Sequence, residues 1–141
     1  MFVISLLQPW ATLVVIGAKT IETRSWSTRH RGHILIHASQ GKAGSIFSED
    51  PPFKKYIPDF NALPFGAIIG SVHIEAIMKV EDFDLSDEAM NVLAMEEKAF
   101  GDYSSGRYGW VLSDPVAFKK PILARGMPGL WQVSDLPFTT V

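Results

Sequence analysis

The polar run Lys19-Thr20-Ile21-Glu22-Thr23-Arg24, with Trp26 just after it, holds residue types that could bind or transform a nucleotide. A carboxylate such as Glu22 could accept hydrogen bonds from a base edge, Arg24 could bind a phosphate or carbonyl group, and Trp26 could stack on a base. Polar side chains at fixed spacing in an apolar frame are typical of small-molecule sites. The alternative is a solvated strand whose ion pairs contribute ~0–1 kcal/mol each to stability.

A second carboxylate, Glu75, stands inside the apolar stretch Ser71-Val72-His73-Ile74-Glu75-Ala76-Ile77. Burying a carboxylate without a partner is costly. Glu75 therefore either faces outward from a barrel, beside His73 and Ile77, or pairs with Lys19 or Arg24. In the second case a desolvated Lys19 could serve as a base or nucleophile, with Glu22 and Glu75 as catalytic carboxylates.

The histidines do not predict a metal site. His33 and His37 are four apart, which on a strand places them ~13 Å from each other at ~3.3 Å per residue. That distance is too long for one metal ion unless the chain bends. The chain has no cysteine, which excludes disulfide and thiolate chemistry. It also has no Gly-rich phosphate loop and no nucleophile elbow, so we expect no cofactor.

Four tryptophans could serve the core or line a pocket, and the core is the commoner role for Trp10, Trp26, Trp110 and Trp131. Trp131 closes the segment Gly126-Met-Pro-Gly-Leu-Trp131. A bend of this kind can aim a side chain at the edge of a site.

Short β-forming segments position these residues. Apolar or alternating patterns predict strands at 2–7, 19–26, 33–38, 66–80 and 108–118, with a last segment at 130–133. Helices are predicted at 10–17 and 86–99, the second with a cap at Ser86, and the Pro-rich stretch 50–64 is expected to be irregular with at most a short helix. The pattern favours a small mixed β-barrel bent at Gly70, with two or three short flanking helices. An open α+β sheet is the alternative.

The length of 141 residues predicts a single domain, 1–141. The formal net charge is −2, which excludes a global basic field that would attract nucleic acid. Charge is distributed unevenly, because 17–42 carries a local +4 and 75–102 a local −7. A local basic patch can still bind a short polyanion.

The apolar start of the chain is not expected to be a signal peptide, because it lacks a basic region before Gln8-Pro9 and a small-residue cleavage site. No run approaches the ~18–20 apolar residues of a membrane helix. The absence of cysteine is typical of a reducing compartment. We therefore expect a cytoplasmic protein without a membrane partner.

Three motifs make the chain resemble the ASCH domain family (activating signal cointegrator-1 homology). They are Ser5-Leu-x-Gln8-Pro9-Trp10-Ala11, then Gly17-x-Lys19-Thr20-x-Glu22-x-Arg24-x-Trp26, and Arg31-Gly32 leading to Ile36-His37-Ala38-Ser39; the late Gly129-Leu130-Trp131 also looks like the family's C-terminal element. The resemblance covers nearly the whole chain and implies an α+β, mainly β, PUA-like barrel with a cleft across its mouth.

The resemblance further implies a role with RNA or a modified nucleotide. On this basis the expected binding residues are Gln8, Pro9, Trp10, Lys19, Glu22, Arg24, Trp26, His37, Ser39 and Trp131. Protein partners are not indicated.

The resemblance also implies an alternative function as a hydrolase. Some bacterial members act as N4-acetylcytidine amidohydrolases that use a Lys, a Thr and a Glu, and a ribonuclease activity has also been assigned in the family. Lys19 and Glu75 would correspond to the Lys and the Glu. This sequence departs at the Thr, where Glu22 stands. The motifs therefore favour a binding cleft, with Lys19, Glu22 and Glu75 as the catalytic set if the protein is an enzyme.

Overall fold

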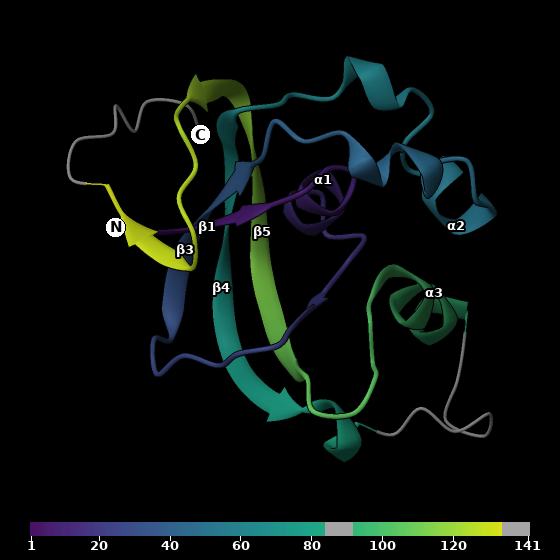
Figure 1. Cartoon of the computed structure of the whole chain (residues 1–141), viewed down its shortest axis with the longest axis vertical. Helices are drawn as coiled ribbons and strands as arrows, with labels where there is room; N and C mark the ends of the chain where they lie inside the picture. Colours follow the sequence, from purple (N-terminus) through teal and green to yellow (C-terminus); the bar gives the residue numbers. More distant parts are fainter. Residues whose placement is uncertain (84–91, 134–141) are drawn as a thin grey trace.

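The computed structural model describes residues 1–83 and 92–133, and within them six strands form one curled sheet in the order β2-β5-β4-β3-β1-β6 (Figure 1). The strands are β1 (Phe2–Leu6), β2 (Ile21–Arg24), β3 (Gly32–Ala38), β4 (Ala67–Lys79), β5 (Tyr108–Leu123) and β6 (Leu130–Gln132). β1 pairs with β3 in parallel, and the other neighbours are antiparallel. The sheet curls into a half-barrel, so the predicted mainly β fold with short flanking helices is confirmed.

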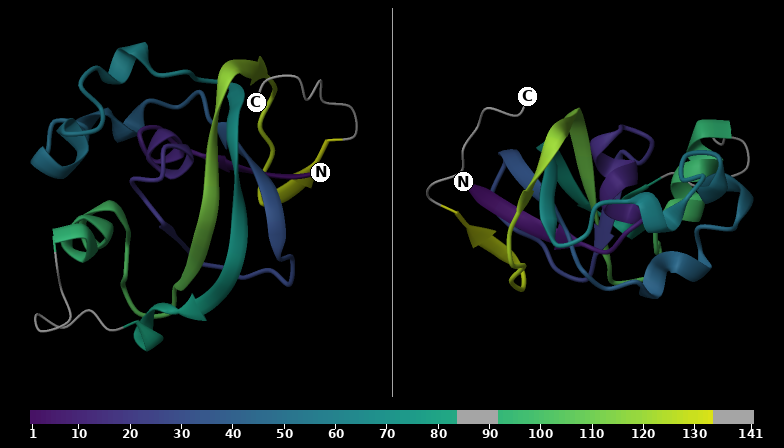
Figure 2. Two further views of the ribbon diagram at one scale, coloured as in Figure 1. Left: turned by 180° about the vertical axis from the view of Figure 1, so that it is seen from behind. Right: turned by 90° about the horizontal axis from the view of Figure 1, so that it is seen from above.

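The two longest strands, β4 and β5, bend together through the middle of the sheet (Figure 2). Their register shifts between Ile68 and Gly70, where a bulge is typical of a strand that must bend. A side chain at Gly70 would place its Cβ 2.1 Å from the carbonyl oxygen of Val116, so only glycine fits. Asp114, directly before Pro115 in β5, has a positive φ of 49.

Three short helices accompany the sheet in the described residues: α1 (Trp10–Val15), α2 (Pro51–Lys54) and α3 (Val92–Phe100). α1 packs on β3, β4 and β5, and its residues Ala11, Val14 and Val15 belong to the core of the sheet. Gly17, at φ +83, ends the predicted first helix as expected. The predicted second helix overlaps α3, while its proposed cap Ser86 lies outside the described residues.

The Pro-rich stretch 50–64 closes a second core beside α1. Its aromatic side chains Phe53 and Phe60 are buried with Leu13 of α1 and Phe100 of α3. α2 and α3 therefore lie together at the end of the molecule away from β6 (Figures 1 and 2). No helix in residues 1–83 and 92–133 is long and apolar enough to cross a membrane.

Candidate functional site

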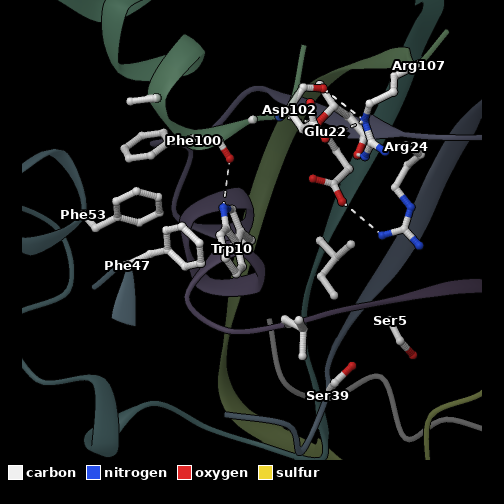
Figure 3. Close-up of a pocket in the computed structure, with 15 residues that line it drawn as sticks. Ser5, Trp10, Glu22, Arg24, Ser39, Phe47, Phe53, Phe100, Asp102 and Arg107 are labelled. Carbon is white, nitrogen blue, oxygen red and sulfur yellow. Dashed lines mark hydrogen bonds and ion pairs between the residues drawn. The ribbon is translucent and has the colours of Figure 1, made fainter. Parts of the chain in front are cut away.

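A cleft of about 530 Å³ opens between α1, β2 and the end of α3, and we call it the aromatic cleft (Figure 3). It is lined by Ser5, Leu6, Leu7, Trp10, Glu22, Thr23, Arg24, Ser39, Phe47, Phe53, Ala99, Phe100, Gly101, Asp102 and Arg107. Four of the residues expected from the sequence are among them: Trp10, Glu22, Arg24 and Ser39.

One wall of the aromatic cleft is built from rings. Trp10 packs edge-on against Phe47 and Phe53, with ring centroids 5.3 and 5.9 Å apart, and Phe53 packs on Phe100 at 5.0 Å. The Trp10 Nε1–H donates to the carbonyl oxygen of Phe100 at 2.9 Å, which holds the indole in place. Trp10 is therefore both a wall of the cleft and the link between α1 and α3.

The opposite wall is polar and is centred on Glu22 of β2 (Figure 3). Glu22 Oε1 lies 3.4 Å from Lys19 Nζ, and Glu22 Oε2 accepts a hydrogen bond from Arg24 Nη1 at 3.2 Å. Two cations thus hold one carboxylate in a single orientation. Arg24 keeps about a quarter of its side chain exposed, whereas Lys19 is 1% exposed and lies outside the lining of the cleft.

A second arginine, Arg107, enters the polar wall from the segment before β5. Its Nη2 donates to the carbonyl oxygen of Thr23 at 3.0 Å and its Nε donates to the carbonyl oxygen of Asp102 at 3.1 Å. The Asp102 amide donates to Thr23 Oγ1 at 2.9 Å. Hydrogen bonds from the hydroxyl and amide of Ser104 lower the pKa of the Asp102 carboxyl, and the Arg107 charge adds to that effect.

Arg107 was not among the residues expected from the sequence, because 101–107 shows no helix or strand periodicity. A basic residue directly before a predicted strand was the available signal. Phe47 and Phe53 were missed as wall residues for the same reason, since they come from irregular segments.

A carboxylate from a distant part of the sequence, Glu97 of α3, contacts the polar run 19–24. It is 7% exposed, and its Oε1 accepts hydrogen bonds from the Thr20 amide and, at 2.6 Å, from Thr20 Oγ1. Burial, with the Glu97 and Glu22 charges, raises the pKa of the Tyr103 hydroxyl above its ordinary value. A buried polar layer thus underlies the cleft.

Glu75, in contrast, does not join the polar run. Its side chain is 51% exposed on β4, accepts a hydrogen bond from Ser113 Oγ and lies 3.7 Å from His73 Nε2. Of the two positions considered for Glu75, the structure therefore has the outward-facing one beside His73, and not a pairing with Lys19 or Arg24. The predicted catalytic set of Lys19, Glu22 and Glu75 is not assembled.

Gln8, Pro9 and Trp26 support the cleft without lining it. Gln8 is fully buried, donates from Nε2 to the carbonyl oxygen of Pro64 at 2.9 Å and accepts from the Thr12 amide at 3.0 Å. Pro9 is buried before α1. Trp26 packs edge-on against Trp110, with Arg24 Cζ 5.6 Å from the centre of its ring. These three predicted binding residues occupy structural positions.

His37 lines a second cleft of about 990 Å³, which adjoins the aromatic cleft, and Trp131 packs edge-on against His37 without lining that cleft. The second cleft is lined by Ser5, His37, Ser39, Gln40, Gly66, Leu123, Ala124, Arg125, Gly126, Met127 and Pro128. His37 Nε2 lies 2.7 Å from the carbonyl oxygen of Ala124 and therefore carries the proton, so Nδ1 accepts from Ser5 Oγ at 3.0 Å. Trp131 Nε1 donates to the same Ser5 oxygen at 3.2 Å.

Within the part of the chain that the structure describes, no group of three His, Asp or Glu side chains is arranged to hold a metal ion. The aromatic cleft presents an aromatic surface that faces two carboxylates, Glu22 and Asp102, and two guanidinium groups, Arg24 and Arg107. This arrangement suits a planar ligand with polar edges.

Comparison with known proteins agrees with the motifs. The family model described as "ASCH domain" matches residues 4–122. The chain is 51% identical over 143 residues to Activating signal cointegrator 1 of Homo sapiens, and 26% identical over 139 residues to that of Mus musculus. Each match covers 94% of this chain and 22% of the relative, so the chain spans about a fifth of the length of these proteins.

A solved structure of an ASCH protein from Zymomonas mobilis has the same fold, with a TM-score of 0.50. It is 21% identical, and the match covers 86% of this chain and 72% of that one. The family model spans most of the chain and ends just before the segment 123–128 of the second cleft. The chain therefore belongs to the ASCH domain family.

Proposed function

We propose that the aromatic cleft binds an unpaired RNA nucleotide or a modified nucleotide. The observation that carries the proposal is the pairing of two walls, rings on one side and Glu22, Arg24 and Arg107 on the other. ASCH domains have a PUA-like fold that is often RNA-binding, and this supports the same class of ligand.

Each wall has a separate part in recognition. A base that enters the cleft can stack on the rings around Trp10 and Phe47, and such stacking contributes ~1–3 kcal/mol per base. Glu22 can accept hydrogen bonds from an exocyclic amine, because Lys19 and Arg24 hold its carboxylate in place. The exposed part of Arg24 can donate to a carbonyl or phosphate oxygen.

The geometry favours binding over the hydrolase alternative. A general base or nucleophile must come within hydrogen-bond reach of its substrate. Lys19 Nζ instead donates to the carbonyl oxygen of Ile21, and its side chain lies behind Glu22 outside the cleft lining. Glu75, the other proposed catalytic group, faces outward on β4.

Replacement of Arg24 tests the proposal. Fluorescence anisotropy with short labelled RNAs should show at least ~10-fold weaker binding for Arg24→Gln, about 1.4 kcal/mol.

Arg29→Gln is the matched control, because Arg29 is exposed and lies outside the lining of the aromatic cleft. It removes the same charge and should leave affinity within ~2-fold, since only long-range electrostatics change. Thermal unfolding of each variant checks that the fold is intact. Equal losses for the two variants, or no binding at low salt, would refute the proposal.

A further inference from the structure

The aromatic cleft and the second cleft share a boundary formed by Ser5 and Ser39, which line both. Ser5 lies on β1 opposite His37 of β3, and the Ser39 amide donates to the carbonyl oxygen of Leu6 at 2.9 Å. Because β1 and β3 run in parallel, both serines stand at the carboxyl end of their strands. The two clefts therefore adjoin at these two residues.

The charges of the two clefts differ. The aromatic cleft is lined by two guanidinium groups, Arg24 and Arg107, and two carboxylates, Glu22 and Asp102, so its formal charge is balanced. Among the described residues that line the second cleft, Arg125 is charged and no carboxylate opposes it. A neutral base with polar edges suits the first cleft, and an anionic phosphate suits the second.

From these two observations we infer that the ligand is a strand and not a free nucleotide. A single-stranded RNA segment places one base in the aromatic cleft, crosses Ser5 and Ser39, and sets its next phosphate beside Arg125 in the second cleft. This inference rests on the proposed function of the aromatic cleft. It adds that the ligand extends beyond one nucleotide and runs from the aromatic cleft to Arg125.

The boundary between the clefts is rigid. Ser5 Oγ donates to His37 and accepts from Trp131, and His37 is tied to Ala124. A Cβ at Gly126 would lie 2.8 Å from His37 Cε1 and 3.0 Å from Ser5 Oγ, so the segment 124–128 lies close to the boundary. A preorganised surface of this kind lowers the entropy lost when a strand binds.

Beyond Arg125 the second cleft offers apolar surface. Leu123 is 85% exposed and Met127 is 58% exposed, and both line the cleft. Exposed apolar side chains beside a phosphate contact can cover a base without reading its identity. We therefore expect little sequence preference at this second position.

A titration series by ligand length tests the inference. The probes are the four ribonucleosides, followed by NMR, and the four homopolymeric tetraribonucleotides, followed by anisotropy. For the unchanged protein, the best tetranucleotide should bind at least ~10-fold more tightly than its nucleoside. Arg125→Gln should weaken tetranucleotide binding ~5-fold and lower the salt slope by ~0.7, with nucleoside affinity within ~2-fold of the unchanged protein.

Two further variants separate the possible outcomes. Arg24→Gln should weaken both kinds of probe, and Arg29→Gln should weaken neither. If nucleosides and tetranucleotides bind alike, or if Arg125→Gln leaves the tetranucleotides unaffected, the strand path is refuted while the proposed function stands through Arg24. If no probe binds, the proposed function is refuted and the strand path with it.

Discussion

Glu22 is the residue on which the polar side of the aromatic cleft depends. Its carboxylate is shared between a fully buried ammonium group, Lys19, and a partly exposed guanidinium group, Arg24. A buried charge that loses its partner pays the full cost of desolvation, whereas a pair replaced together by apolar groups can be nearly neutral. Replacement of Glu22 alone should therefore reduce stability more than replacement of Lys19 alone.

Glu22→Gln should destabilise the protein by about 3 kcal/mol, because it leaves Lys19 buried without its carboxylate. Lys19→Met should cost less, since Glu22 keeps Arg24 as a partner. The double variant Lys19→Met with Glu22→Gln should recover part of the loss. Urea unfolding measures all three, and a loss below ~1 kcal/mol for Glu22→Gln would show that Lys19 does not depend on this carboxylate.

At the scale of elements, the aromatic wall depends on how closely the 3-10 turn Ala43–Ile46 approaches the start of α1. Gly44 lies at the contact, where an added Cβ would stand 2.0 Å from the carbonyl oxygen of Gln8 and 2.8 Å from Trp10 Cζ3. The turn carries Phe47 at its end, so this contact also sets one ring of the wall.

Gly44→Ala should destabilise the protein by about 2 kcal/mol, the cost of forcing backbone apart in a packed region. It should also weaken ligand binding, because Trp10 and Phe47 move together. Gly41→Ala is the matched control, since its nearest neighbour is the flexible tip of Leu7 at 3.1 Å. Thermal unfolding and RNA titration of both variants give the answer, and equal stability for the two would contradict the close contact.

Much of this arrangement was predictable from the sequence, because strands with one buried face leave an alternating pattern. The predicted strand at 19–26 separates Glu22 and Arg24 by two positions, which puts both on one face, and their hydrogen bond agrees with this. The glycine at 70 predicted the bend in β4. Alternation, however, does not say which face of a strand is concave. Glu75 was for that reason assigned to the site, although it faces outward.

Other parts of the cleft could not be predicted because they depend on tertiary packing. Arg107 and Asp102 come from a segment without periodicity. The carbonyl oxygen of Thr23 positions Arg107, and the hydroxyl of Thr23 positions Asp102. Glu97 stood in a strongly acidic stretch, where nothing local distinguished it from its neighbours. Its burial follows from the packing of α3 against Thr20.

At the scale of the whole molecule, the acidic charge of 75–102 partly serves to hold α3 in place. Glu97 turns inward to Thr20, and Glu96 accepts a hydrogen bond from Tyr56 at 2.9 Å and pairs with Lys55 at 3.4 Å. The acidic segment is therefore not simply a free repulsive face. RNA binding should depend on local contacts more than on long-range attraction, as the net charge of −2 also indicates.

The alkaline limit of stability should depend on Tyr103. Its hydroxyl is buried and has no hydrogen-bond partner in residues 1–83 and 92–133, and burial raises its pKa. In the unfolded chain the tyrosine ionises near pH ~10, while the folded protein keeps it neutral. Stability is therefore full below pH ~10 and falls as the pH rises toward the higher folded pKa.

Tyr103→Phe should remove this part of the alkaline decline and, since a buried unpaired hydroxyl is costly, raise stability at pH 7 by about 1 kcal/mol. Urea unfolding between pH 7 and 11 measures both effects. Tyr108→Phe is the control for loss of a phenol and should retain the decline of the parent. An unchanged alkaline decline in Tyr103→Phe would show that the hydroxyl is not buried as described.

The pairing of β1 with β6 has a consequence for the order in which the protein acquires its structure during synthesis. Ser5 and Trp131 are hydrogen-bonded although they lie 126 residues apart in the sequence. β1 therefore leaves the ribosome long before its antiparallel partner β6 has been synthesised. Until then β1 can pair only with β3, and its other edge is open to a strand from another chain. Translation past Leu130 is thus the event that closes the nascent sheet and completes the boundary between the clefts.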